Sequence, residues 1–566
     1  MIILGVNPLF FDTSACVLVD GKVAAAVQEE RLSREKRTTR FPEQAIRWCL
    51  KSAGLTIDDI DEVALPVNAG IYLERLVRAQ AEPLRYRGEL LYSVPAFLIS
   101  LRPGARVSET EQRFAFEGGG ETRLAWVRHH LAHAASSFYP SPFEDAALLA
   151  VDAFGEKDCV LTGVGRGTSI GILATQEFPH SLGSFYATLT ELLGFKPYSE
   201  EWKVMGASAY GDPAPYLKTL RDCFELRDDG GFELDLSFFN FFNFHRPLSF
   251  ALKLEQALGG RRHPDEPMTE RHFAIASATQ RVTEEVLLHM MRALAHQTGL
   301  ASLCVSGGVF LNSVMNGKIL EQTPFRDLYV PCAPDDTGTA IGAALARNYA
   351  HTPGSPRHRI DSPFFGPSYT NAEIEAELVL ARARYRLVDD PAAEAARLIA
   401  AGRVVGWHQG ALEFGDRALG HRSILADPRD ASMKDRLNRE VKHREEFRPF
   451  APAVPAERAA DWFEGAAVSP FMDRVYPVRP DRRATIPAVT HVDGSARLQT
   501  VRHESDPLFQ SLIERFGALT GVPVVLNTSF NVQGEPIVCS PKDALRTFAS
   551  CGMNALVMGP FVLEKS

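Results

Sequence analysis

The chain lacks the patterns that would place it in a membrane or an oxidising compartment. Its 8 cysteines are scattered over 566 residues, without a C-x-x-C pair or the spacing of a disulfide framework. The apolar opening MIILGVNPLFFD has no basic segment, and Asn7, Pro8 and Asp12 interrupt it, which is typical of neither a signal peptide nor a membrane span. We therefore expect a cytoplasmic protein without a cysteine-based zinc site.

An excess of positive charge is also missing. The formal net charge is −9, which argues against broad binding of nucleic acid or of an anionic membrane surface. Hydrophobic residues make up 45% of the chain and charged residues 23%, as in a globular protein with a large core. At 566 residues the chain is long enough for two or three domains.

Two similar strand-and-hairpin units stand in the first half. The opening strand MIILGVN leads to DTSACVLVDGKVAAAVQEE, which predicts a hairpin turning at Asp20 and Gly21. The strand AALLAVDAFGE leads in the same way to DCVLTGVGRGTSIGILAT. This weak repeat predicts a duplicated α/β architecture with a cleft between two lobes.

Glycines and carboxylates follow two later strands. In LCVSGGVFLNSVMNGKIL a strand runs into Gly307 and Gly308, and we expect a helix to start near Asn312. In LYVPCAPDDTGTAIGAALARNYA a strand is followed by Asp336 and an alanine-rich helix. A Pro-, Gly- and Ser-rich stretch then predicts a linker at 356–370, between a domain over 1–355 and an α/β domain over 371–566.

Three histidines in RHHLAHAASSFYP predict a metal site. On a helix, His129 and His133 share a face, whereas His130 points elsewhere and replaces the glutamate of the zinc-protease pattern H-E-x-x-H. With the carboxylates of Asp152 and Asp336 they make a donor set suited to iron, zinc or manganese. The alternative is that these histidines are core or capping residues of the helix.

A local basic set in this acidic chain predicts an anion site. Arginine pairs bidentately with phosphate or carboxylate, and polar residues after the strand in VVLNTSFNVQGEP can line a pocket. The alternative is a solvated helix over 433–446 with pairs such as Arg436 and Glu440, and we prefer it for Arg436, Arg439 and Arg444. The local basic set is Arg417, Arg422, Lys442 and Arg448, and later stretches of the chain add Arg497, Asn527, Thr528, Ser529 and Asn531.

Motifs along almost the whole chain resemble one family, the O-carbamoyltransferases of antibiotic and nodulation-factor biosynthesis. They are EERLSREKR, HHLAHAASSFY, LLAVDAFGE, SLGSFYATLT, WKVMGASAYG, SGGVFLNSVMNGK, PDDTGTAIGAA, GDRALGHRSILADP, VKHREEFRPFAP, RLQTV and LNTSFNVQGEPIV. The resemblance implies an α/β fold: a two-lobed ASKHA (actin/Hsp70-like) N-terminal domain, followed by an α/β YrdC-like C-terminal domain.

The resemblance also implies a two-stage reaction. The C-terminal domain would form carbamoyl adenylate from carbamoyl phosphate and ATP with Mg²⁺, releasing phosphate and pyrophosphate. The N-terminal domain would transfer the carbamoyl group to a hydroxyl of a small-molecule natural product, releasing AMP. By this resemblance, the first-stage pocket would be lined by Arg417, Arg422, Lys442, Arg448, Arg497, Asn527 and Ser529, and Lys442 and Arg448 would act in the reaction. His129, His133, Asp152 and Asp336 would hold a divalent metal, with Fe²⁺ favoured over Mn²⁺ or Zn²⁺. The nucleotide of the second stage would meet Lys203, Gly307, Gly308 and Asn312.

One position departs from the family pattern. The first hairpin of the family reads F-H-D-x-S-A, and its histidine is thought to assist transfer, whereas this chain has FFDTSA, with Phe11 in that place. Phenylalanine cannot accept a proton. Either His130 or Asp12 serves as the base, or transfer needs little base help, or the protein is a transfer-impaired or regulatory nucleotide-binding pseudoenzyme.

Other readings of the chain have less support. A hydrogenase-maturation carbamoyltransferase would carry an acylphosphatase-like start and cysteine zinc motifs, which this sequence lacks. The basic stretch EERLSREKRTTRFP, with Arg31, Arg34, Lys36 and Arg37, could meet the acceptor or the nucleotide phosphates, or could be a solvated segment. The sequence leaves the acceptor's identity and a homo-oligomeric state open.

Overall fold

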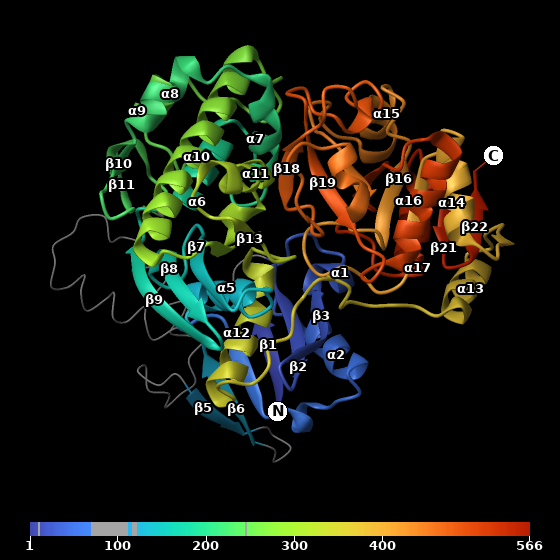
Figure 1. Cartoon of the computed structure of the whole chain (residues 1–566), viewed down its shortest axis with the longest axis horizontal. Helices are drawn as coiled ribbons and strands as arrows, with labels where there is room; N and C mark the ends of the chain where they lie inside the picture. The colour runs from blue at the N-terminus through green and yellow to red at the C-terminus, as the bar shows by residue number, and fades with distance from the viewer. Residues whose placement is uncertain (9–11, 69–110, 116–120, 244–245, 566) are drawn as a thin grey trace. The chain divides into compact units, whose positions relative to one another are not determined.

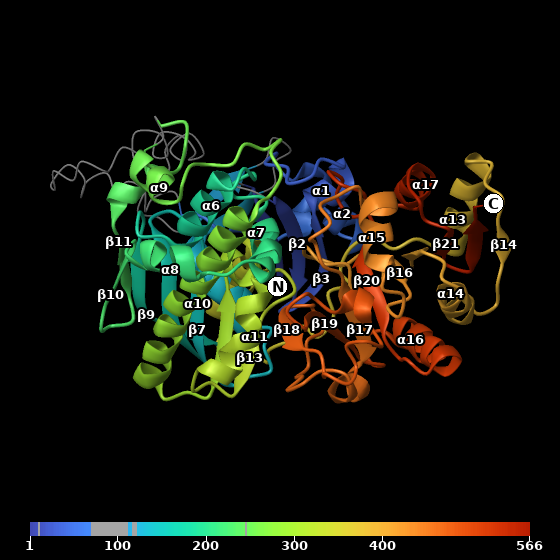
Figure 2. The same cartoon turned by 90° about the horizontal axis from the view of Figure 1, so that it is seen from above.

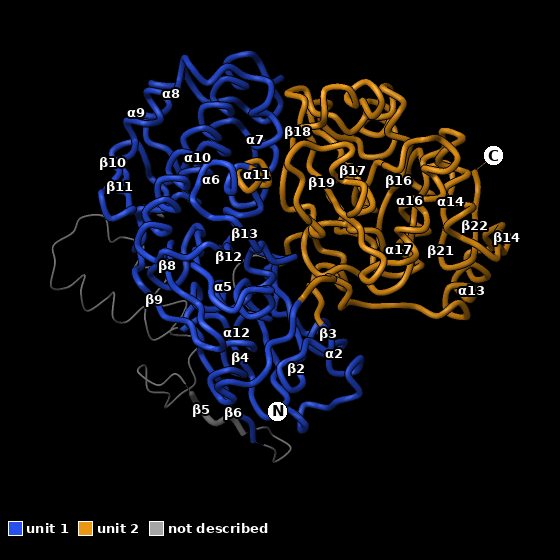
Figure 3. Tube along the Cα trace, in the orientation of Figure 1, with its two compact units in different colours: residues 1–25, 39–312, 318–359 blue, residues 26–38, 313–317, 360–566 orange. Residues whose placement is uncertain are grey.

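The computed structural model describes residues 1–8, 12–68, 111–115, 121–243 and 246–565 (Figure 1). Two compact units divide the chain (Figure 3). Unit 1 comprises residues 1–25, 39–312 and 318–359, and unit 2 comprises residues 26–38, 313–317 and 360–566. Two short segments that precede residue 318 therefore belong to the second unit.

Two sheets that share a five-strand topology form the frame of unit 1, and the first adds an antiparallel edge strand. Each begins with a three-stranded hairpin arrangement, and each continues from its first strand into two further parallel strands. The duplicated α/β architecture predicted from the repeat is confirmed, and so is the two-lobed ASKHA-type fold that the family resemblance implied. The first sheet has the order β3(Lys22–Gln28), β2(Ser14–Val19), β1(Ile2–Asn7), β4(Glu62–Leu65), β6(Glu121–Trp126), β5(Glu111–Ala115); the second has the order β13(Asp327–Tyr329), β12(Ser302–Ser306), β7(Asp145–Val151), β8(Asp158–Arg166), β9(Ser169–Glu177).

The first hairpin turns where the sequence predicts it. Asp20 and Gly21 separate β2 from β3, with φ of 48° and 80°. A two-residue turn with positive φ at both positions matches the right-handed twist of the strands, and aspartate followed by glycine is a common pair there.

Two alanine-rich helices lie between the sheets of unit 1 (Figure 1). Helix α12(Asp336–His351) packs on the first sheet, helix α5(His129–Phe138) packs on the second, and the two helices pack against each other. A Cβ atom at Gly342 of α12 would lie 1.9 Å from the carbonyl oxygen of Ala132 in α5. The small residues therefore permit the close approach that brings the starts of α5 and α12 together.

Of the remaining helices of unit 1, α2(Glu43–Ser52) packs on β2 of the first sheet, and the longest one contacts β7 of the second. The longest, α10(Glu270–Thr298), starts with a capping box at Thr269 and ends at Gly299, whose φ is 65°. In the described part of the chain no helix combines the length and the apolar character that crossing a membrane requires. The other elements are α6(Leu182–Leu192), α7(Glu201–Ala207), α8(Ala214–Arg221), α9(Leu252–Ala257) and the strand pair β10(Phe224–Leu226) and β11(Phe232–Leu234).

A nine-stranded mixed sheet forms the centre of unit 2 (Figure 2). One face carries α14(Pro391–Ala400) and α16(Pro507–Thr520), and the other carries α13(Asn371–Leu380) and α17(Pro541–Ser550), each over a core of buried aliphatic and aromatic side chains. The strand order is β14(Arg386–Leu387), β22(Phe561–Glu564), β21(Ala555–Met558), β15(Val405–His408), β16(Arg422–Ala426), β20(Val525–Ser529), β17(Ala451–Pro455), β19(Ser495–Val501), β18(Arg474–Pro477).

The two early segments are fastened into unit 2 by specific contacts. The first contains α1(Glu29–Ser33), and the backbone N–H of Ala26 donates to the carbonyl of Phe365 at 3.2 Å. The second is the first part of α11(Ser313–Gln322), where Asn316 Nδ2 donates to the carbonyl of Asp473 at 2.9 Å. A Cβ at Gly317 would lie 2.1 Å from the carbonyl oxygen of Val475, so this segment packs tightly on β18.

The prediction of a charged α-helix over 433–446 is wrong in the length of the helix and in its helical type. The structure has a short helix α15(Met433–Arg436) followed by a π-helix over Leu437–Lys442, and His443 ends it with a φ of 49°. A π-helix places side chains at a different angular step from an α-helix and often occurs near functional residues. Here it turns Lys442 into the interior.

Candidate metal centre and anion pocket

Helix α5 presents its two metal-ligand candidates from the first turn. The buried carboxylate of Glu156 accepts the backbone N–H of His129 at 3.0 and 3.2 Å. It thereby satisfies a free amide at the positive end of the helix. His133 follows one turn later on the same face, and both imidazoles are fully buried.

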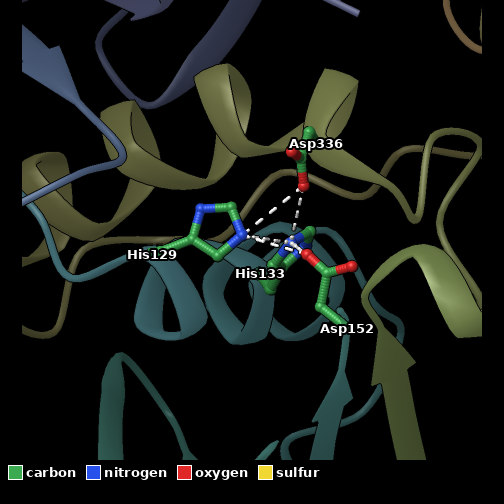
Figure 4. Close-up of side chains that lie close together, drawn as sticks. All are labelled: His129, His133, Asp152 and Asp336. Atoms are coloured by element: carbon green, nitrogen blue, oxygen red, sulfur yellow. Dashed lines mark hydrogen bonds and ion pairs between the residues drawn. The ribbon is translucent and has the colours of Figure 1, made fainter. Parts of the chain in front are cut away.

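Four side chains of unit 1 converge on one point (Figure 4). Asp152 follows the end of β7, and Asp336 is the first residue of α12. The Nε2 atoms of His129 and His133 lie 3.1 Å apart. From Asp152 Oδ2 they lie 3.1 and 3.3 Å away, and from Asp336 Oδ1 they lie 3.4 Å away in both cases. The metal-ligand set predicted from the sequence is thus assembled in space.

These distances fit a metal centre. Metal–ligand bonds of about 2.0–2.2 Å place neighbouring donor atoms roughly 3.0 Å apart in an octahedral site and roughly 3.4 Å apart in a tetrahedral one. The observed separations of 3.1 to 3.4 Å lie in this interval. Two neutral imidazoles and two carboxylates suit a borderline divalent ion.

The electrostatics of the cluster favour a bound positive charge. Burial by itself would lower the pKa of His129, but the carboxylates of Asp336 and Asp152 outweigh it and hold that pKa well above its usual value. Burial would raise the pKa of Asp152, yet the two imidazoles hold it well below its usual range. The cluster therefore attracts either a proton on His129 or a metal ion.

Glycines predicted as nucleotide contacts lie beside Asp152. Gly307 has a φ of 95°, and a Cβ there would lie 2.1 Å from the carbonyl oxygen of Val151. A Cβ at Gly308 would lie 3.2 Å from Asp152 Oδ1. Side chains at these positions would displace the end of β7, so both glycines position the carboxylate of Asp152.

The two candidate bases, His130 and Asp12, are both buried in unit 1. The His130 ring lies 5.3 Å from that of His129 and 6.0 Å from that of His133, centroid to centroid. Burial, followed by the charges of those two neighbours, holds its pKa well below the usual value. Asp12 has a φ of 59°. Phe11, which occupies the place of the family's histidine, lies outside the described residues.

The other nucleotide candidates of unit 1 are engaged with neighbouring side chains. Lys203 Nζ lies 2.7 Å from Glu200 Oε1 and sits over the ring of Phe195. The amide of Asn312 exchanges hydrogen bonds with Gln280, at 2.8 and 3.1 Å. Their role as nucleotide contacts remains a prediction.

In unit 2, Lys442 is a buried cation without a carboxylate partner in the described part of the chain. Its Nζ donates to the carbonyls of Ser529 and Asn531 at 2.6 and 2.9 Å, to Asn531 Oδ1 at 2.8 Å and to Ser529 Oγ at 3.2 Å. Burial, and then the positive charges of Arg444, Arg448 and Lys36, hold its pKa well below the usual value. Neutral oxygens alone surround the ammonium, so an anion would relieve this charge.

Further arginines lie within electrostatic range of the same region. The pKa of Arg497 is held well below its usual value by burial and by Arg417 and Arg448. Its Nε atom is buried without a hydrogen-bond partner among the described residues. Arg448, on a loop after the π-helix, lies 3.6 Å from Glu445 and is largely buried. We call the set Lys36, Arg417, Lys442, Arg448 and Arg497 the basic cluster.

Two predicted pocket residues form hydrogen bonds within the protein. Arg422 is fully buried and donates to the carbonyls of Pro367, Gln409, Gly410 and Cys539 at 2.5 to 3.2 Å. Asn527 Nδ2 donates to the Ala418 carbonyl at 3.2 Å. These side chains brace the loop that carries Arg417.

The sequence favoured a solvated helix face for Arg436, Arg439 and Arg444, and the structure agrees with this for the first two. Arg436 pairs with Glu440 at 3.3 Å, and Arg439 is an exposed neighbour of the same carboxylate. For Arg444 it is wrong. Arg444 donates to Asn438 Oδ1 at 2.6 Å and lies over the ring of Phe450. Arg444 lies beyond the π-helix, after the left-handed residue His443, so the assumed α-helical spacing did not predict its position.

Two supporting carboxylates escaped the sequence analysis. Glu413 Oε1 accepts the backbone N–H groups of Leu419, His421 and Arg422 at 2.8 to 3.0 Å, so the loop folds around it. Glu156 caps α5. The sequence offers a signal for Glu156, because this residue lies in VDAFGE only four residues after Asp152. Glu413 has no such signal.

Comparisons with known proteins show the family of the chain. Two family models cover most of the chain, and both describe a group-transfer enzyme. "Carbamoyltransferase N-terminus" matches residues 2–345 and "Carbamoyltransferase C-terminus" matches residues 396–565. The chain therefore belongs to the carbamoyltransferase family.

Its relatives include nodulation proteins. Nodulation protein NolNO of Sinorhizobium fredii is 38% identical over 99% of this chain and 80% of its own length. Nodulation protein NolO of Bradyrhizobium diazoefficiens is 39% identical over 78% of this chain and 79% of its own length. An uncharacterised Synechocystis protein, sll1178, is 38% identical over 100% of this chain and 97% of its own.

Proposed function

We propose that the protein is an O-carbamoyltransferase that works in two stages. Unit 2, with a YrdC-like domain, forms carbamoyl adenylate, and unit 1 transfers its carbamoyl group to a hydroxyl of a small-molecule natural product. The observation that carries the proposal is the basic cluster, in which Lys442 has only neutral partners and Arg497 has a buried Nε without a partner among the described residues. Such a set suits a substrate that brings several phosphates together.

The first stage consumes carbamoyl phosphate, water and ATP. Hydrolysis of carbamoyl phosphate gives carbamate and inorganic phosphate. An oxygen of the carbamate attacks the α-phosphorus of ATP, and the bond to the pyrophosphate leaving group breaks. Lys442 and Arg448 neutralise the charge that accumulates on the phosphate oxygens, and Arg417 and Arg497 orient the reactants in line. Arg422 and Asn527 keep the Arg417 loop in place.

The second stage takes place beside the cluster of unit 1. The acceptor hydroxyl attacks the carbamoyl carbonyl, the bond to AMP breaks, and the hydroxyl proton passes to a base. His129, His133, Asp152 and Asp336 would hold a divalent ion, iron by preference, that supplies Lewis-acid polarisation of the carbonyl. Gly307 and Gly308 keep Asp152 aligned, and His130 and Asp12 are the candidate bases.

A second candidate function rests on Phe11. A phenylalanine in the place of the family's histidine favours a nucleotide-binding protein that forms carbamoyl adenylate but transfers slowly, or one that regulates without transfer. The retained metal-ligand set favours the enzyme. Restoring the histidine with Phe11→His separates the two, because only an enzyme limited by this base gains transfer rate.

The test is pyrophosphate release by the purified protein given ATP, with and without carbamoyl phosphate. We expect release that requires carbamoyl phosphate and that falls to background in Arg448→Ala. Arg439→Ala is the matched control, because this arginine is exposed beside Glu440. Absence of carbamoyl-phosphate-dependent release from the wild-type protein with every divalent metal tested rejects the two-stage function and leaves the nucleotide-binding protein.

A further inference from the structure

Asn531, which is buried in unit 2, forms hydrogen bonds through every polar group that it carries. Its backbone N–H donates to the Ser529 carbonyl at 3.0 Å, and its Nδ2 donates to the Glu535 carbonyl at 2.8 Å. Its Oδ1 accepts from Ser529 Oγ at 2.7 Å and from Lys442 Nζ at 2.8 Å. Because Nδ2 faces a carbonyl and Oδ1 faces two donors, these contacts fix one orientation of the amide.

The same residue supplies most of the close contacts of the Lys442 ammonium. An ammonium has three N–H groups to donate. The three nearest oxygens, at 2.6 to 2.9 Å, are the carbonyl of Ser529 and the carbonyl and Oδ1 of Asn531. None of them carries a charge. They therefore hold the ammonium in place without neutralising it.

These contacts lie on the face of the sheet from which Arg497 extends. Side chains alternate along a strand, so Asn527 and Ser529 of β20 share a face, and Arg497 and Gln499 of β19 share a face. Asn527 Nδ2 donates to Gln499 Oε1 at 2.7 Å, so both pairs lie on the same face. Lys442 Nζ reaches this face at Ser529 Oγ, 3.2 Å away.

An amide is an unusual choice for this position. Lysine is almost never fully buried unless it is paired with a negative charge. A carboxylate at position 531 would have nearly the same shape as the amide and could accept from Lys442 and Ser529 in the same way, losing only the bond to Glu535. It would form a buried ion pair with Lys442. The amide instead leaves the positive charge of Lys442 available to an anion.

We propose that Asn531 is a positioning residue of the basic cluster: its neutral oxygens fix the Lys442 ammonium and keep its charge available to a phosphate ligand. This role rests on the adenylate-forming function proposed above. The ligand class is a phosphate anhydride, which includes pyrophosphate, ATP and carbamoyl phosphate. Asn531 acts on the ligand through Lys442, and Lys442 attracts the ligand by its charge, because its N–H groups already donate to protein oxygens.

The experiment measures binding of inorganic pyrophosphate to the full chain by isothermal titration calorimetry. We expect Asn531→Asp to weaken binding about tenfold or more, because the new carboxylate neutralises Lys442, and Asn531→Ala to weaken it less. A purely structural role predicts the opposite order, since aspartate keeps the contacts with Lys442 and Ser529 and alanine does not. Asn371→Asp is the matched control, because Asn371 is an exposed asparagine of α13 in the same unit.

A double-mutant cycle tests whether Asn531 acts through Lys442. The double variant Asn531→Ala/Lys442→Met should bind pyrophosphate within twofold of Lys442→Met alone, since the group that Asn531 positions is gone. A clear further loss in the double variant would show that Asn531 acts on the ligand independently, and would overturn the inference. Circular dichroism melting of each variant verifies that it is folded.

The outcomes separate this role from the proposed function. The inference is overturned if Asn531→Asp binds pyrophosphate within twofold of wild type, if Asn531→Ala is the weaker binder of the two, or if the wild-type chain binds no pyrophosphate. If binding changes as expected but carbamoyl-phosphate-dependent release is absent, the role of Asn531 stands and the adenylate-forming function fails. If release is present and Asn531→Asp binds like wild type, the function stands and the inference fails.

Discussion

The two candidate sites attract ligands of opposite charge. In unit 1, two carboxylates and two imidazoles converge and attract a positive charge. In unit 2, lysines and arginines gather with few carboxylates and attract negative charge. Each site would repel the ligand of the other. A metal ion and a polyphosphate would therefore bind at different places in this chain.

The sites also differ in how they are built. Two of the four metal-ligand candidates lie one turn apart on a single helix, and the other two follow a strand and start a helix. The basic cluster takes its members from a segment near the N-terminus, two loops, a π-helix and a strand. Changes in one site should therefore leave the other intact, and the predictions that follow test this independence.

The largest effect is expected from Lys442→Met. Removing a preorganised charge from a site of phosphoryl chemistry typically costs about 10²–10³-fold in rate. We expect pyrophosphate release to fall by this factor while the metal content of the protein, measured by inductively coupled plasma mass spectrometry, stays at the wild-type level. Loss of metal in this variant would show that the two sites are coupled.

The reverse result is expected from His133→Ala. Removal of a ligand should weaken metal binding by more than the 10- to 100-fold typical of an outer-shell partner. Metal content after dialysis against a weak chelator checks this, and pyrophosphate release should remain within twofold of wild type. His263→Ala is a matched control, since His263 is an exposed histidine of unit 1. A decrease of release in His133→Ala would argue against separate stages.

A smaller effect is expected from Glu156→Gln. This carboxylate accepts the first backbone N–H of α5 and so orients His129 without being part of the donor set. The amide keeps the shape but loses the charge at the helix N-terminus, and we expect metal affinity to fall about 10- to 100-fold. Equal metal affinity for wild type and Glu156→Gln would mean that the carboxylate serves folding only.

Metal affinity should rise with pH. The raised pKa of His129 keeps its imidazole protonated to higher pH than a free histidine, and the metal must displace that proton. Affinity should therefore increase about tenfold per pH unit below this pKa and level off above it. Competition titrations with a chromophoric chelator at several pH values measure it. A pH-independent affinity would show that the imidazoles are neutral before the metal binds.

The smallest effect is expected from Arg439→Ala. This side chain is exposed beside Glu440, and exposed pairs contribute about 0.2–1 kcal/mol. We expect a free energy of unfolding within about 0.5 kcal/mol of wild type and unchanged pyrophosphate release. Arg444→Ala provides the contrast, because Arg444 bonds Asn438 and covers Phe450 and should destabilise unit 2 clearly. Denaturant titrations compare the two.

The sequence predicted the metal-ligand set because its information is local. His133 follows His129 at helical spacing, Asp152 closes a strand, and the repeat pointed to two similar lobes. The interior of unit 2 was predicted less well. Arg422 was assigned to the ligand but holds four carbonyls, and Arg444 was assigned to solvent because an α-helical step was assumed. Contacts such as Arg31 with Gly415, which join positions 384 residues apart, leave no periodic signal.

The assignment of residues 26–38 and 313–317 to unit 2 sets a limit on how the gene can be divided. A fragment that starts at residue 360 would lack the turn held by Arg31 and Arg34. It would also lack the segment that packs tightly on β18, where a Cβ added at Gly317 would lie 2.1 Å from the carbonyl oxygen of Val475. Separately expressed halves of this chain would each be incomplete. Domain exchange between relatives would have to carry these two short segments together with the C-terminal part.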